Sequence, residues 1–115
     1  MARDREPVPS LDPASPDPTT EVRLDVTIGG RVQGVGFRYY VLRRAVDLGL
    51  VGWVMNTDRG VRCVVEGPRA RVEQLLEIVG IGPAGALVEE IRPNWSGPTG
   101  GFSTFEIRSG AHPGD

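Results

Sequence analysis

The chain has 115 residues, a net charge of −2 and 6% aromatic residues, which is enough sequence for one domain. The negative charge and the low aromatic content argue against a nucleic-acid partner. Because no apolar run could span a bilayer and the first residues lack the apolar core of a secretion signal, we expect a cytoplasmic protein with no membrane partner.

The two ends of the chain have the composition of disordered tails. Residues 1–20 carry half of the ten prolines, and acidic residues outnumber basic ones there. Such segments bury too little apolar surface to fold. Residues 110–115 have a similar composition. We therefore predict a folded domain over residues 21–109, between an acidic tail at 1–20 and a second tail at 110–115.

The domain is predicted to begin with a strand, a glycine-rich loop and a helix. Residues 22–28 alternate apolar and polar side chains, as in a half-buried strand. A helix is predicted over residues 37–48, because its apolar residues recur at steps of four, four and three and so share one face. Gly49 follows at the position where a glycine commonly ends a helix.

A hairpin, a second helix and two short strands follow. Strands are predicted at 50–55 and 61–65, with a turn between them, and the apolar alternation around Cys63 indicates a buried thiol. A second helix begins near Pro68 and ends near Gly82. The remaining strands are predicted at 86–91 and 102–108, the last with Phe105 and Ile107 facing inward.

This order of elements predicts an α+β fold. Two helices with one apolar face each, and strands with one apolar face each, are accommodated most simply by a ferredoxin-like βαββαβ sandwich. In that arrangement both helices cover one face of an antiparallel sheet, with a possible fifth strand. The fold class alone does not indicate a function.

The nine residues GRVQGVGFR, at 30–38, are the strongest functional signal. Glycines allow successive N–H groups to converge, and at the start of a helix such groups bind anions. Arg38 adds a planar donor group that suits phosphate. Because the chain has no lysine and lacks the third glycine of a dinucleotide motif, two common phosphate sites are excluded. A tight strand-to-helix turn is the alternative interpretation.

Few residues could serve as a catalytic acid, base or metal ligand. The only histidine, His112, lies in the predicted tail, and no cluster has metal-ligand spacing, so we expect neither metal nor cofactor. Asp47, Glu89 and Glu90 are expected on solvated surfaces, and Asp58 is expected to stabilise its turn. This scarcity suits an acyl phosphate, whose leaving carboxylate has a pKa of about 4, because positioning and charge stabilisation then suffice.

Asn56 is the candidate for holding a water molecule. It ends the second predicted strand, and its amide offers both a donor and an acceptor. A turn-forming asparagine before Thr57 and Asp58 is the alternative explanation.

Segments 30–38 and 48–56 (LGLVGWVMN) resemble the two signatures of the acylphosphatase family almost letter for letter, and the resemblance extends over residues 22–108. It implies a small, metal-independent hydrolase that cleaves acyl phosphates to a carboxylate and phosphate, with the substrate itself accepting the proton of water. Arg38 resembles the phosphate-binding arginine, and Asn56 resembles the residue that orients the attacking water. The resemblance assigns the phosphate cradle to the backbone amides of Gln33, Gly34, Val35, Gly36 and Phe37.

One departure and two alternatives accompany this interpretation. In the turn after Asn56, the aspartate comes one position earlier than in many members of the family. This difference would bring Arg59 within reach of the acyl group. The first alternative is a non-catalytic, phosphate-binding regulatory domain, although such a domain would not need Asn56. The second is an RNA-binding module, against which charge and aromatic content argue. With no further apolar stripe in the sequence, we expect a monomer.

Overall fold

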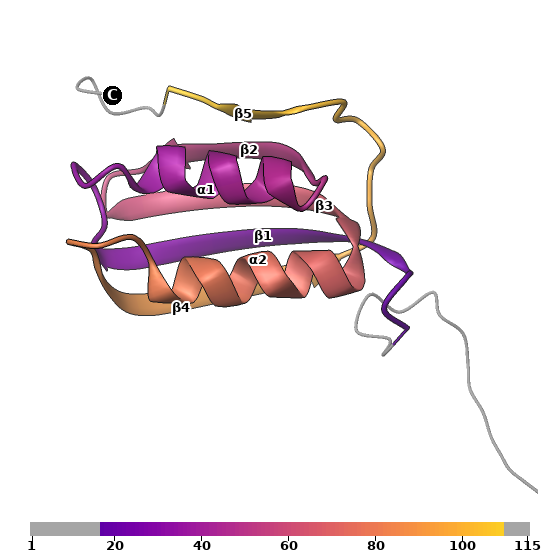
Figure 1. Cartoon of the computed structure of the whole chain (residues 1–115), viewed down its shortest axis with the longest axis horizontal. Coiled ribbons are helices and arrows are strands. Elements are labelled where there is room, and N and C mark those ends of the chain that lie inside the picture. Colours follow the sequence, from indigo (N-terminus) through magenta and orange to yellow (C-terminus); the bar gives the residue numbers. More distant parts are fainter. Residues whose placement is uncertain (1–16, 110–115) are drawn as a thin grey trace, which may run out of the picture.

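The computed structural model describes residues 17–109. They form two layers, with two helices on one side of a five-stranded sheet (Figure 1). The elements in chain order are β1 (Glu21–Arg31), α1 (Phe37–Asp47), β2 (Val51–Asn56), β3 (Gly60–Pro68), α2 (Arg69–Ile81), β4 (Leu87–Ser96) and β5 (Phe105–Ile107). The tail predicted at 110–115, with His112, and residues 1–16 of the other tail lie outside the described residues.

The strand order is β4-β1-β3-β2-β5, and the first four strands pair antiparallel with their neighbours. This order confirms the ferredoxin-like fold. The sheet is mixed rather than purely antiparallel, because β5 pairs parallel with β2. The segment between β4 and β5 carries the chain from one edge of the sheet to the other, so that β5 runs in the direction of β2 (Figure 1).

The core lies between the sheet and the helices. Alternate residues of β1 face it, and they meet apolar stripes of α1 and α2 where the sequence pattern predicted them. The fully buried side chains include Val22, Leu24, Val26 and Ile28 from β1, Phe37, Val41 and Ala45 from α1, and Val72, Leu75 and Val79 from α2. Cys63 of β3 is also buried, as predicted, and burial raises the pKa of its thiol to about 12.

All five observed strands differ in their bounds from the prediction; β1 continues to Arg31 and β3 to Pro68, and the clearest differences are in β4 and β5. β4 continues through Pro93 to Ser96, whereas the prediction ended at residue 91. It lies at an edge of the sheet, where a proline costs no ladder hydrogen bond. In β5, Phe105 is buried but Ile107 is 39% exposed. The expectation that Ile107 faces inward is therefore wrong, because it borders a cavity instead of core side chains.

Residues 17–20, which composition assigned to the tail, contact the domain. The main-chain carbonyl oxygens of Pro18 and Thr20 accept hydrogen bonds from the N–H groups of Ala70 (3.0 Å) and Arg69 (2.9 Å). The first N–H groups of a helix lack intrahelical acceptors, and α2 has no side-chain cap. The turn at 17–20 therefore takes the place of a cap for α2.

Glu66 of β3 holds the segment between β4 and β5. Its buried carboxylate accepts hydrogen bonds from the Thr99 N–H (3.0 Å), the Thr99 hydroxyl (2.8 Å) and the Gly100 N–H (3.1 Å). Arg23 of β1 completes the set with an ion pair of 2.9 Å. Burial opposes ionisation, but these donors together keep the pKa of Glu66 below its usual value. The carboxylate thereby fixes the path that leads into β5.

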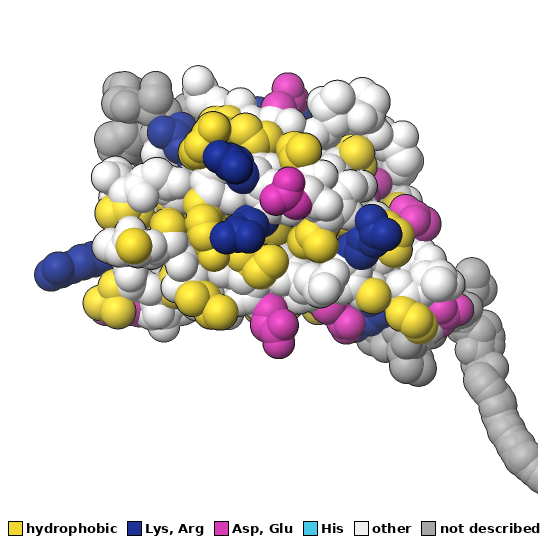
Figure 2. All heavy atoms as spheres, in the orientation of Figure 1, with side chains coloured by type: hydrophobic (Ala, Val, Ile, Leu, Met, Phe, Trp, Pro, Cys, Tyr) yellow, Lys and Arg dark blue, Asp and Glu magenta, His cyan; other side chains and the backbone are white. Residues whose placement is uncertain are grey.

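The helix-bearing face carries scattered arginine and acidic side chains between apolar ones (Figure 2). Within residues 17–109, no helix is both long enough and apolar enough to cross a membrane.

Candidate active site

The loop between β1 and α1 is built on two left-handed glycines. Gly34 and Gly36 each have a φ of 76°. A Cβ atom at either position would meet no atom within 4 Å. Backbone conformation, rather than crowding, therefore requires glycine at both positions. The resulting curl turns the chain from the end of β1 into the first turn of α1.

The first turn of α1 offers main-chain donors. Gly36 is the N-cap residue, no side chain caps the helix, and the first turn contains no acidic residue. The first helical hydrogen bond runs from the Tyr40 N–H to the Gly36 carbonyl oxygen, at 3.0 Å. The N–H groups of Phe37, Arg38 and Tyr39 therefore have no acceptor within the helix, and the helix dipole adds positive potential there.

A cavity of about 220 Å³ lies against this helix start. Its lining residues come from the loop, from α1 and from the ends of β2 and β5, and they are Val32, Gly34, Gly36, Phe37, Arg38, Tyr39, Asn56 and Ile107. The fold thus brings Arg38 and Asn56, which the sequence singled out separately, to one cavity. Asn56 is 8% exposed and ends β2.

Arg38 is the one charged residue among those that line this cavity. Its side chain is half-buried. Across the described part of the chain, its guanidinium takes part in no hydrogen bond or ion pair with another residue. A cation held near open main-chain N–H groups, with no carboxylate beside it, favours the binding of an anion with several oxygens.

Gln33 and Val35 do not line this cavity, although they belong to the same loop. They border a separate groove of about 360 Å³ together with Arg31, Asp58 and Arg59. The Gln33 side chain donates from Nε2 to the carbonyl oxygens of Thr57 and Gly60, the latter at 2.8 Å. Gln33 therefore ties the glycine loop to the turn between β2 and β3.

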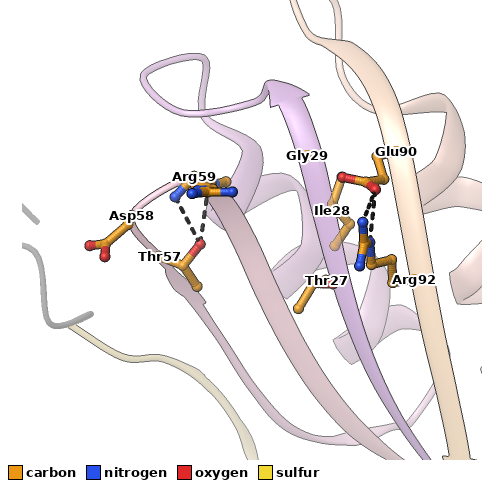
Figure 3. Close-up of a pocket in the computed structure, with 9 residues that line it drawn as sticks. Thr27, Ile28, Gly29, Thr57, Asp58, Arg59, Glu90 and Arg92 are labelled. Carbon is orange, nitrogen blue, oxygen red and sulfur yellow. Dashed lines mark hydrogen bonds and ion pairs between the residues drawn. The ribbon is translucent and has the colours of Figure 1, made fainter.

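That turn is held by Thr57. Its hydroxyl oxygen accepts hydrogen bonds from the N–H groups of Arg59 (3.3 Å) and Gly60 (3.1 Å). Figure 3 shows these two bonds, with the Asp58 carboxylate pointing away from them. Within residues 17–109 the Asp58 side chain makes no hydrogen bond, so Thr57 and not Asp58 supplies the side-chain acceptor of this turn.

The hollow drawn in Figure 3 is distinct from the cavity that contains Arg38. It lies beside β1, β4 and the turn, has a volume of about 450 Å³, and includes Glu90 and Arg92, which pair with each other. Arg59 borders this hollow and the groove beside Gln33, but it does not line the cavity with Arg38 and Asn56. The structure thus does not support the expectation that Arg59 reaches the acyl group.

Three residues of the cavity lining, Val32, Tyr39 and Ile107, were not among the site residues predicted from the sequence. Tyr39 directly follows Arg38 in α1, so its proximity could have been predicted from the motif. Ile107 gave no comparable signal, because its place depends on the pairing of β5 with β2. Within residues 17–109, no three His, Cys, Asp or Glu side chains are grouped so that they could hold a metal ion.

Comparisons with known proteins identify the family of this chain. A model of the acylphosphatase family matches residues 24–107. The acylphosphatase of Moorella thermoacetica is 49% identical over 89 residues, which are 76% of this chain and 95% of that protein. The acylphosphatase of Salinibacter ruber is 46% identical over 90 residues, covering 77% and 95% of the two chains.

A solved structure gives the same result for the fold. The crystal structure of acylphosphatase from Bacillus subtilis superposes with a TM-score of 0.73 at 36% identity, covering 76% of this chain and 98% of that one. Since the family model spans most of the chain and these relatives align over nearly their whole length, the chain belongs to the acylphosphatase family.

Proposed function

We propose that this acylphosphatase binds the phosphoryl group of an acyl phosphate at the start of α1 and positions water with Asn56. The N–H groups of Gly34, Gly36 and Phe37, which line the cavity, and the Arg38 guanidinium hold the phosphoryl oxygens, and Gln33 and Val35 complete the loop that carries these groups. The Asn56 amide accepts a hydrogen bond from the attacking water and orients its lone pair toward phosphorus. The juxtaposition of Arg38 and Asn56 at one cavity supports this proposal most strongly.

The reaction then needs no side-chain acid. The water oxygen forms a bond to phosphorus while the bond from phosphorus to the bridging oxygen breaks. The bridging oxygen leaves with the electron pair as part of a carboxylate, which is stable without protonation because its pKa is about 4. The proton of water passes to a phosphoryl oxygen of the substrate. Arg38 and the amides stabilise the charge on the equatorial oxygens.

Several further features belong to the same proposal. Because the leaving group is good, the chemistry requires no metal ion and no cofactor. We propose a monomer that acts in the cytoplasm on small acyl phosphates, with neither nucleic acid nor a membrane as partner. The catalytic unit is residues 21–109, and the tails at 1–20 and 110–115 take no part in the reaction.

Hydrolysis of benzoyl phosphate in the presence of EDTA tests the proposal. The wild type is compared with Arg38→Ala and with Arg92→Ala, a control that removes a 73% exposed arginine on β4. We expect Arg38→Ala to lower kcat/KM by at least about a hundredfold and to weaken inhibition by inorganic phosphate, while Arg92→Ala resembles the wild type. A folded wild type that binds phosphate but cleaves nothing would instead indicate the non-catalytic phosphate-binding domain.

A further inference from the structure

The lining of the cavity at the start of α1 includes exposed apolar side chains beside Arg38 and Asn56. Five large apolar side chains of the described chain are exposed, and two of them, Tyr39 and Ile107, line this cavity. Tyr39 is 58% exposed and Ile107 is 39% exposed. Exposed apolar side chains that converge on a cavity with few polar groups are typical of ligand sites.

The two side chains come from elements that are held independently. Tyr39 stands in the first turn of α1, next to Arg38, and the Arg43 guanidinium lies 5.8 Å from the centroid of its ring. Ile107 pairs with Val54 of β2, and the following N–H group, of Arg108, donates to the Val54 carbonyl oxygen at 2.9 Å. Both positions are therefore set by the backbone without any ligand.

We infer that Tyr39 and Ile107 form the binding surface for the acyl group, and that the enzyme prefers acyl phosphates with an apolar or aromatic acyl group. This inference rests on the proposed function, because the phosphoryl group must first be placed against Arg38 and the loop. With the phosphoryl group there, the acyl group projects toward the rim of a cavity of only about 220 Å³. It then covers apolar surface that otherwise contacts water.

The charge of the cavity favours the same class of substrate. Arg38 is its one charged lining residue, and it is already engaged by the phosphoryl group in the proposed function. Arg59 lies in other hollows, so it offers no second cation to the acyl group. An acyl group that carries its own phosphate or carboxylate would have to lose water against the apolar side chains of Tyr39 and Ile107, which is unfavourable, and the Arg43 guanidinium beside the Tyr39 ring stands outside the cavity lining.

The test compares two substrates, benzoyl phosphate and acetyl phosphate, by the ratio of their kcat/KM values. Tyr39→Ala and Ile107→Ala should each lower this ratio roughly three- to tenfold, because an aromatic acyl group loses more contact than a methyl group does. Tyr39→Phe keeps the ring and should retain the wild-type ratio. If both alanine variants kept the wild-type ratio of kcat/KM values, the inference would be overturned, even if both substrates were still cleaved.

Matched controls separate a local effect from a general one. Val46→Ala removes a side chain that is 58% exposed on the same helix, as Tyr39 is, and Leu87→Ala removes one that is 51% exposed in β4. Neither lines the cavity, so both should keep the wild-type ratio. If the ratio of kcat/KM values fell in these controls as much as in Tyr39→Ala, Tyr39 and Ile107 would not form a specific binding surface.

Binding of substrate analogues distinguishes failure of this inference from failure of the proposed function. Phenacylphosphonate and acetonylphosphonate carry a methylene group in place of the bridging oxygen and cannot be hydrolysed at that position. Titration calorimetry should show that the wild type binds phenacylphosphonate more tightly than acetonylphosphonate. The ratio of the two affinities should be roughly three- to tenfold smaller in Tyr39→Ala. Equal affinity for both analogues would overturn the inference even if neither acyl phosphate were cleaved, whereas absence of turnover alone would contradict only the proposed hydrolysis.

Discussion

The side-chain amide of Gln33 donates a hydrogen bond to the main-chain carbonyl oxygen of Thr57, and a second one to that of Gly60. Because both acceptors are carbonyl oxygens, only the amide nitrogen can face them. Thr57 directly follows Asn56, so this pair of bonds connects the loop that carries the proposed phosphate cradle to the residue proposed to hold water. Gln33 therefore acts on the distance between the two halves of the site.

Gln33→Ala should lower kcat about tenfold, because Asn56 is then no longer held at a fixed distance from the loop. Inhibition by phosphate should change little, because the loop keeps its glycines and Arg38. The free energy of unfolding should fall by about 1 kcal/mol, since two carbonyl oxygens lose a donor. Steady-state kinetics and urea unfolding measure the two effects. Gln74→Ala, which truncates an exposed glutamine on α2, is the control. An unchanged kcat would show that the tie has no part in catalysis.

Asn56→Ala should reduce kcat by about a hundredfold or more, as expected for loss of a group that positions the nucleophile. The inhibition constant for phosphate should stay within about twofold of the wild type, because Arg38 and the main-chain donors remain. Asn56→Asp should weaken phosphate inhibition as well, since it adds a negative charge to the cavity. If Asn56→Ala weakened phosphate inhibition as much as it reduced turnover, the residue would be structural.

Gly36→Ala should destabilise the chain by about 1–2 kcal/mol, because a φ of 76° is unfavourable for a residue with a Cβ. The space for a methyl group is open, so the cost arises from backbone conformation. Gly97→Ala is the matched control, since it also meets no atom within 4 Å but has no positive φ. Thermal unfolding and phosphate inhibition measure the effects. Equal stability of the two variants would show that the loop conformation does not require glycine at position 36.

Glu66→Gln should lower the free energy of unfolding by about 2 kcal/mol at neutral pH, because the amide accepts fewer of the surrounding hydrogen bonds and carries no charge. The pKa of Glu66 is lowered in the folded state, so its stabilising effect is complete above the pKa of an unperturbed glutamate, about 4.3. The effect is lost as pH falls through the lower folded-state pKa.

Urea unfolding at several pH values checks this dependence. The difference in the free energy of unfolding between wild type and Glu66→Gln should become smaller as the pH falls below about 4. Glu90→Gln, which alters an exposed ion pair with Arg92, is the control and should change stability by less than about 1 kcal/mol. A difference for Glu66→Gln that stayed constant with pH would contradict the role of its charge.

Local sequence pattern predicted the parts of the fold that depend on local contacts. The spacing of Phe37, Val41 and Ala45 located α1, and all three are buried. Pattern failed at the sheet edges. The predicted strand ended at residue 91, yet β4 continues through Pro93 to Ser96, because an edge strand does not need that N–H group. Which neighbour β5 would join, and in which direction, was not encoded in its own residues.

The same distinction applies to the candidate site. Arg38 and Asn56 were identified through two separate motifs, and the cavity contains both. The contact of Gln33 with the turn could not be predicted, because it joins side chain to backbone across distant segments. Ile107 was misjudged for a related reason. Alternation in a short strand indicates which residues share a side, but it does not reveal whether that side meets core or cavity.

The placement of β5 bears on the behaviour of the protein at high concentration. Without β5, the backbone of β2 would present unpaired N–H and C=O groups along six residues, a template for another chain to add a strand. β5 covers part of that edge and, with three residues, offers little edge of its own. At the opposite side β4 ends the sheet with Pro93 and charged side chains. Both margins of the sheet are thereby poor partners for intermolecular pairing, which favours a chain that resists aggregation.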